Sequence, residues 1–219
     1  TDFGHPFTSK RPTLNTDYFE TFNRKNVHLI DLKENPIVKI TKNGIKTKNE
    51  DLKFDKIIFA TGYDALSGPI LSLNLTGRNK IKLKNYWKNG PKTYLGLMIP
   101  NFPNFFIISG PGSPSVLTNV PAQIQQHVEW ISEFIKYLEK SNSLSVEPKP
   151  KEAENWVKKI NTLANKSLFM KAKNSWYKGD NIPGKPKTFI PYPAGLPQYR
   201  EICNKVRKKM YKGFNIFLK

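Results

Sequence analysis

The sequence contains a single cysteine, Cys203, among its 219 residues. One cysteine excludes an internal disulfide framework and a cysteine-based zinc site. The three histidines, at positions 5, 28 and 127, lie too far apart for metal-ligand spacing. No apolar run approaches the ~20 residues of a membrane-spanning helix, and the first residues resemble no secretion signal. We therefore expect a cytoplasmic protein without a metal site or a membrane partner.

Arginine is also scarce. Lysine and arginine together number 36 against 17 acidic residues, for a net charge of +19, yet only 5 of the 36 are arginine. A nucleic-acid site normally gathers charge on one face and uses arginine for phosphate and base contacts. Here the lysines are scattered from Lys10 to Lys219, and asparagine is abundant as well. This pattern favours a compositional bias of an AT-rich genome over a nucleic-acid partner, and a salt-sensitive DNA shift would reverse that interpretation.

A complete dinucleotide-binding motif, Gly-x-Gly-x-x-Gly, is missing as well. The apolar run Lys56–Phe59 nevertheless leads into Ala60-Thr61-Gly62-Tyr63-Asp64, as a parallel strand does at the carboxyl edge of an α/β sheet. Residues 110–115, Gly-Pro-Gly-Ser-Pro-Ser, imitate a phosphate-binding loop but lack its third glycine, and their prolines have no N–H to donate. The sequence therefore predicts an α/β protein with a cofactor edge but without the cofactor motif.

The remaining pattern predicts short strands and three longer helices. The longest helix, 121–140, is expected to use Thr118 or Asn119 as its cap and Pro121 in its first turn. Its inward face is expected to carry Ile124, Val128, Ile131, Ile135 and Leu138, whereas helix 151–167 is expected to bury Trp156, Ile160 and Leu163. Further helices are expected at 17–23 and 199–210, and strands at 27–30, 37–41, 45–47, 54–59, 81–83, 93–97 and 105–109.

Three short segments are candidates for chemistry. Lys10-Arg11-Pro12 offers two cations for an oxyanion or phosphate, although a solvated pair is the ordinary interpretation in so basic a chain. The backbone donors near Leu117–Val120, at a helix N-terminus, are either a structural turn or a contact to an electron-rich ring carbonyl. Trp176-Tyr177 lies in a loop rich in proline and glycine, where the tryptophan either anchors the loop or lines a pocket.

Taken in order, these segments resemble flavin-dependent Baeyer–Villiger monooxygenases, the relatives of cyclohexanone and phenylacetone monooxygenase. The resemblance covers nearly the whole chain. It is carried by Lys10–Pro12, Tyr18–Glu20, Phe22–Val27, Phe59–Ala65, Tyr94–Gly96, Asn101–Asn104, Gly110–Ser115, Gln126–Ile131, Ser175–Tyr177, Asn181–Pro186, Tyr199-Arg200 and Tyr211–Phe214.

That resemblance implies an α/β fold, namely a partial two-domain Rossmann-like FAD/NAD(P)-binding flavoprotein monooxygenase fold that lacks its amino-terminal half. Residues 1–60 would close the NADPH-binding domain. Residues 61–219 would form the carboxyl-terminal part of the FAD-binding domain, with an active-site loop near 174–190. The implied reaction inserts one oxygen atom from O2 into a small-molecule ketone and uses FAD and NADPH.

The resemblance also implies roles for single residues. Arg11 matches the catalytic arginine that stabilises the flavin peroxide anion and orients the nicotinamide, a role that suits a permanent cation. Lys10 matches the lysine near the NADPH 2′-phosphate, and Trp176 the loop tryptophan over the cofactor and substrate pocket. The segment beside the flavin that lines the substrate pocket corresponds to Ser115, Val116, Leu117 and Val120, and the signature at the domain junction corresponds to Thr61, Gly62 and Asp64.

Both glycine motifs of that family, and its Phe-x-Gly-x-x-x-His-x-x-x-Trp-Pro signature, are missing from this sequence. We therefore expect the chain alone to be inactive, to bind neither cofactor tightly, and to expose apolar surface meant for its own missing amino-terminal half. One alternative is a related flavin monooxygenase that oxygenates nitrogen or sulfur in an amine or sulfide, which product analysis would distinguish. Another is a non-catalytic split subunit that completes a flavin fold, which would co-purify with an amino-terminal half.

Overall fold

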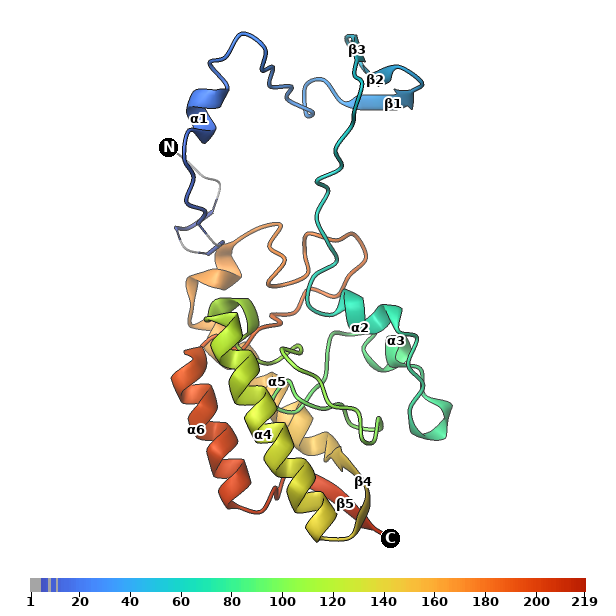
Figure 1. The fold of residues 1–219 in the computed structure, drawn as a ribbon, viewed down its shortest axis with the longest axis vertical. Helices are drawn as coiled ribbons and strands as arrows, with labels where there is room; N and C mark the ends of the chain where they lie inside the picture. Colours follow the sequence, from blue (N-terminus) through green and yellow to red (C-terminus); the bar gives the residue numbers. More distant parts are fainter. Residues whose placement is uncertain (1–4, 8, 11) are drawn as a thin grey trace. The chain divides into compact units, whose positions relative to one another are not determined.

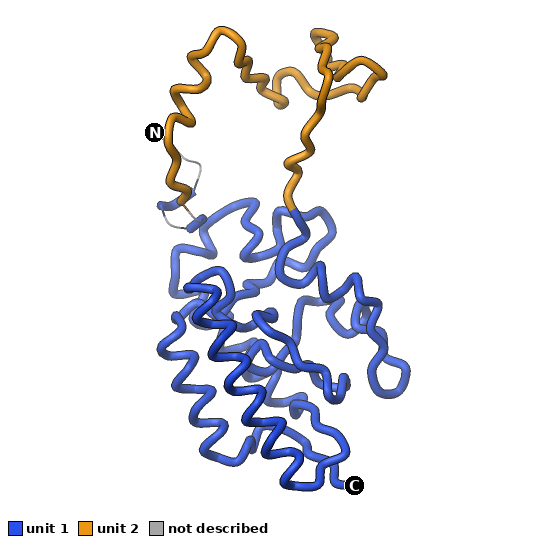
Figure 2. Tube along the Cα trace, in the orientation of Figure 1, with its two compact units in different colours: residues 1–11, 63–219 blue, residues 12–62 orange. Residues whose placement is uncertain are grey.

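The structure is a computed structural model that describes residues 5–7, 9–10 and 12–219. The chain divides into two compact units, Pro12–Gly62 and Thr1–Arg11 with Tyr63–Lys219 (Figure 2). The units meet between residues 62 and 63, and residues 1–11 group with the larger unit. The expected domains, residues 1–60 and 61–219, stay a prediction. The cofactor assigned to each domain stays a prediction.

The smaller unit is built on a three-stranded antiparallel sheet. Its strands β1 (Ile37–Thr41), β2 (Gly44–Thr47) and β3 (Asp51–Lys53) follow each other in the order β1-β2-β3, and helix α1 (Tyr18–Thr21) precedes them (Figure 1). The expected hairpin turn at Asn43-Gly44 is confirmed by the pairing of Thr41 with Gly44. Gly44 has φ +154°, and a Cβ there would lie 1.9 Å from the carbonyl oxygen of Leu52, so only glycine fits between β2 and β3.

Two strands expected in this unit are absent. Residues 27–30 and 54–59 form no strand in the part of the chain that the structure describes. The backbone N–H of Phe54 donates to Asn43 (3.0 Å) and ends the meander, after which Ile58 is 90% and Phe59 69% exposed. An apolar run becomes a strand only where another strand pairs with it. The composition predicted a buried strand at 54–59, and the described residues supply no strand to pair with it.

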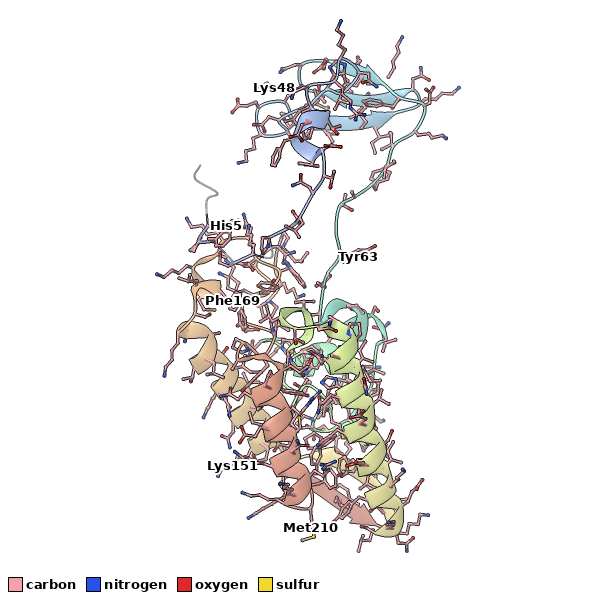
Figure 3. All side chains as sticks on the ribbon, turned by 60° about the vertical axis from the view of Figure 1, so that its left-hand side comes forward. His5, Lys48, Tyr63, Lys151, Phe169 and Met210 are labelled. Carbon is pink, nitrogen blue, oxygen red and sulfur yellow. The ribbon has the colours of Figure 1, made fainter. Side chains whose placement is uncertain are left out.

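The larger unit is mainly helical. Its long helices are α4 (Val120–Lys140), α5 (Pro150–Asn165) and α6 (Gly195–Lys208), and its short ones α2 (Gly68–Ser72) and α3 (Leu83–Tyr86). Helices α4 and α6 run side by side (Figures 1 and 3). Strand β4 (Ser143–Pro148) pairs antiparallel with β5 (Phe214–Leu218). Three 3-10 turns complete the unit: η1 (Arg78–Lys80), η2 (Ser115–Leu117) and η3 (Leu168–Lys171).

The prediction of three short strands at 81–83, 93–97 and 105–109 is wrong. Each leaves only an isolated bridge: Thr76 with Lys82, Tyr94 with Met98, and Met98 with Phe106. Left-handed residues lie within the expected strand 93–97 (Leu95, φ 58°) and in the turn after it (Asn101, φ 68°, and Asn104, φ 58°), and they prevent a continuous ladder. The helices at 121–140, 151–167 and 199–210 are confirmed by α4, α5 and α6.

The buried face of α4 differs from the expected stripe. Ile131 is buried as expected, but Ile124, Val128 and Ile135 are 39%, 44% and 40% exposed, and Trp130 and Phe134 are buried instead. The aromatic pair reaches further into the core: Phe134 stacks on Tyr211 at 3.9 Å between ring centroids, and the indole N–H of Trp130 donates to the carbonyl of Cys203 at 3.0 Å. Aromatic side chains bury more area than aliphatic ones and so set which face turns inward. Helix α5 buries Trp156 and Ile160 as expected, and Leu163 is half-buried against the core.

Candidate functional site

Residues 109–114 form a loop that leads through η2 to the N-terminus of α4. The indole N–H of Trp156 donates to the carbonyl of Gly112 at 2.9 Å, and the Thr93 hydroxyl donates to Pro111 at 2.6 Å. Gly112 has φ +91°, and a Cβ there would lie 2.7 Å from the Thr93 hydroxyl oxygen. Hydrogen bonds with the core therefore hold this loop in place.

Two polar side chains of α4 hold the same loop from the other side. The Gln123 amide donates to the hydroxyls of Ser109 (3.1 Å) and Ser113 (3.2 Å), and the backbone N–H of Ser109 donates to Nδ1 of His127 (3.0 Å). Gln123, His127 and Ser113 are completely buried. Neither Gln123 nor His127 could be assigned this role from the sequence, because a polar side chain on a helix is ordinarily exposed.

His127 is neutral in this environment. Its Nδ1 accepts a hydrogen bond, so the proton lies on Nε2, which has no hydrogen-bond partner among the residues that the structure describes. Burial lowers the pKa of His127 from 6.5 to about 4, because the charged ring would lose its hydration. The imidazole supports the loop and is not a general base exposed to a substrate.

The segment predicted beside the flavin follows this loop. Ser115 is buried in a left-handed conformation (φ 47°), and Val116, Leu117 and Val120 are half-buried. The Asn119 side chain caps α4 by accepting from the N–H of Ala122 at 3.1 Å, which confirms the expected cap. Within the described ranges, the N–H groups of Asn119 and Val120 donate to no protein acceptor.

Those two free donors suit a ring carbonyl of a flavin. They lie at the positive end of a helix of 21 residues, where the aligned peptide dipoles favour an electron-rich group. The donor set therefore fits FAD at this point, although no glycine-rich phosphate loop accompanies it in the sequence.

Trp176 lies in a segment that we call the aromatic loop, residues 174–190. Tyr177, Phe189 and Ile190 of this loop are buried, and the Ile190 N–H donates to the carbonyl of Tyr177 at 2.8 Å. Trp176 is half-buried, with its ring 4.7 Å from that of Tyr177. Both ends of the loop are thus fixed in the core while the Trp176 ring keeps an exposed face.

Asp64 forms an ion pair with Lys185, a residue to which the sequence assigned no role. Lys185 of the aromatic loop forms an ion pair with the Asp64 carboxylate and donates to the carbonyl of Ala65 at 3.1 Å. In the sequence, Lys185 stood out only as part of the segment Asn181–Pro186 that carries the family resemblance, and no role was assigned to it. Thr61 and Gly62 are exposed and belong to the smaller unit.

The structure describes only part of the predicted cationic segment Lys10-Arg11-Pro12. Lys10 is half-buried and has no ion-pair partner in the part of the chain that the structure covers. Arg11, the predicted catalytic residue, lies outside the described residues. The roles of both stay predictions.

No family model matches the chain, but relatives match along nearly its whole length. It is 42% identical over 96% of its length to cyclohexanone 1,2-monooxygenase from Acinetobacter sp. and 41% identical over 93% to a Baeyer–Villiger monooxygenase from Pseudooceanicola batsensis. It is also 37% identical over 94% to phenazine N-monooxygenase from Lysobacter antibioticus. The chain spans 37–38% of the length of these relatives.

Solved structures agree with this similarity. Oxidized steroid monooxygenase bound to NADP superposes with a TM-score of 0.88 at 40% identity, over 98% of this chain and 40% of that one. A complex of OTEMO with FAD and NADP gives 0.90 at 34% identity, over 97% of this chain and 39% of that one. The expected α/β flavoprotein monooxygenase fold is therefore confirmed. The chain is similar along nearly its whole length to a section of the Baeyer–Villiger-type flavoprotein monooxygenases.

No helix among the described residues is long and apolar enough to cross a membrane.

Proposed function

We propose that this chain supplies part of an FAD- and NADPH-dependent Baeyer–Villiger monooxygenase, which inserts one oxygen atom of O2 into a small ketone. The observation that carries the proposal is the similarity over nearly the whole chain to a cyclohexanone monooxygenase and to structures bound to FAD and NADP. In such an enzyme FAD supplies the oxygen chemistry and NADPH the hydride.

The residues of this chain would bind and position. The N–H groups of Asn119 and Val120 would hold a flavin carbonyl, and Ser115, Val116, Leu117 and Val120 would line the substrate side. Lys10 would bind the NADPH 2′-phosphate, and Trp176 would cover the pocket and exclude water. Arg11 would stabilise negative charge next to the flavin and orient the nicotinamide.

The remaining part of the fold would come from a polypeptide section with the two glycine-rich motifs. Exposed apolar side chains support this: Ile124, Val128 and Ile135 along α4, and Ile58 and Phe59 after the meander. Isolated exposed apolar residues are ordinary, but a row along one helix face indicates a surface that another element covers.

Co-expression of this chain with the complementary section of the Acinetobacter relative tests the proposal. We expect a complex that consumes NADPH and converts cyclohexanone to its lactone, while the Arg11→Ala variant of the complex forms no lactone. A complex that binds both cofactors but oxidises no ketone would contradict the proposal.

The similarity to phenazine N-monooxygenase supports a second candidate, oxygenation of an aromatic nitrogen. Product analysis with phenazine, a thioether and cyclohexanone in parallel would separate the two. An N-oxide or sulfoxide without lactone would favour the second candidate. A cytoplasmic location also stays a prediction, which cell fractionation tests.

A further inference from the structure

The tip of the aromatic loop, residues 179–187, makes side-chain hydrogen bonds to the rest of the larger unit through Lys185. Of the side-chain hydrogen bonds that described residues of the tip make, those of Lys185 are the ones that leave the loop. Asp180, by contrast, accepts from the N–H of Ser175 (2.5 Å) and pairs with Lys178 (3.0 Å), both within the loop.

Lys185 is unusually buried for a lysine. Its side chain is 10% exposed, against 46% for the Asp64 carboxylate that it meets. Its methylene groups lie against Gly179, where a Cβ would come within 3.2 Å of Cδ of Lys185. A buried ammonium requires a charged or polar partner, and here the Asp64 carboxylate and the Ala65 carbonyl supply it.

We propose that Lys185 is a positioning residue that latches the tip of the aromatic loop onto the turn at Asp64 and thereby keeps Trp176 in place. Trp176 is coupled to the tip because its carbonyl accepts from the N–H of Gly179 at 3.3 Å. Asp64 is the second residue of the larger unit after Gly62, so the latch joins the loop to the point where the chain enters the larger unit. That the latched loop covers NADPH rests on the proposed function.

Two measurements on this chain, without cofactors, test the latch. The N–H groups of Ile182 and Lys185 form weak turns within the tip, donating at 3.4 and 3.2 Å, so their hydrogen exchange reports tip opening. Trp176 is half-buried while Trp87, Trp130 and Trp156 are 3%, 3% and 4% exposed, so acrylamide quenching of tryptophan fluorescence reports mainly on Trp176.

We expect Lys185→Met to accelerate exchange in the tip about 3- to 10-fold and to increase quenching, since a charge-assisted hydrogen bond to a half-exposed carboxylate is lost. Asp64→Asn should have a similar or smaller effect, because Lys185 keeps its bond to the Ala65 carbonyl, and the double variant should match Lys185→Met, because both carry the loss of the Lys185–Asp64 pair. The matched control is Lys187→Met, two positions along the same loop, where the lysine is exposed and unpaired within the described residues. It should behave as wild type.

Equal exchange and quenching in Lys185→Met and Lys187→Met would overturn the latch, as would a double variant whose effect is the product of the single effects. In the reconstituted complex, Lys185→Met should raise KM for NADPH about 3- to 10-fold with kcat for lactone formation little changed. If the complex has no activity, the proposed function fails, while the exchange and quenching results still decide the latch.

Discussion

Acid should destabilise the larger unit through His127. The ring is completely buried, its Nδ1 accepts from the N–H of Ser109, and its pKa is lowered from 6.5 to about 4 by burial. Since the folded state resists protonation, the unfolded state binds the proton first. The stability that neutral His127 contributes is fully present above pH 6.5 and is lost as the pH falls towards 4. The shift corresponds to a loss of about 2 kcal/mol between pH 7.5 and pH 5.

The assay is urea unfolding followed by tryptophan fluorescence at pH 7.5, 6.5, 5.5 and 5.0. His127→Asn keeps an acceptor near the position of Nδ1 and cannot titrate, so it should be less stable than wild type at pH 7.5 but lose about 2 kcal/mol less on acidification. His28→Asn, at an exposed histidine of the smaller unit, is the matched control and should follow wild type. If His127→Asn and wild type show the same dependence on pH, the reasoning is refuted.

Three further predictions concern α4 and α6. In urea unfolding, Phe134→Ala should lower the free energy of unfolding by about 3–5 kcal/mol, and Ile135→Ala, at the neighbouring 40% exposed position, should lower it clearly less. Equal losses would show that α4 buries its aliphatic face and not its aromatic one. Asn119→Ala should cost about 1 kcal/mol through loss of the cap of α4, and an unchanged midpoint of thermal unfolding would contradict the bond to Ala122. Burial raises the pKa of the Cys203 thiol to about 12, so Cys203 should react with a thiol reagent only after urea is added. Rapid labelling of the native chain would contradict its burial.

Local signals in the sequence predicted the long helices well. Asn119 and Pro121 mark the start of α4 through capping and backbone preference, which do not depend on distant parts of the chain. The face that α4 buries was not predictable in this way, because Gln123 and His127 look like surface residues until the loop at 109–113 brings acceptors and donors to them.

The strands were harder to predict than the helices. Strand β4 contains Ser145 and Glu147, and it forms because Val146 and its neighbours pair with residues near Ile216, far away in the sequence. The apolar run Lys56–Phe59 shows the opposite case. Its composition is typical of a strand, but it forms none because no neighbouring strand among the described residues pairs with it. For the site, resemblance supplied the residues, while the contact of Lys185 with Asp64 required three-dimensional coordinates.

The most direct test of the account is the amount of flavin bound by this chain alone and by its complex with the complementary section of a relative. We expect the isolated chain to be colourless, because two backbone donors at the start of α4 cannot hold FAD without the glycine-rich motifs. The complex should show the flavin absorption band, with an intensity that corresponds to about one FAD bound per complex. A yellow protein purified from the isolated chain, or a colourless complex, would contradict the account.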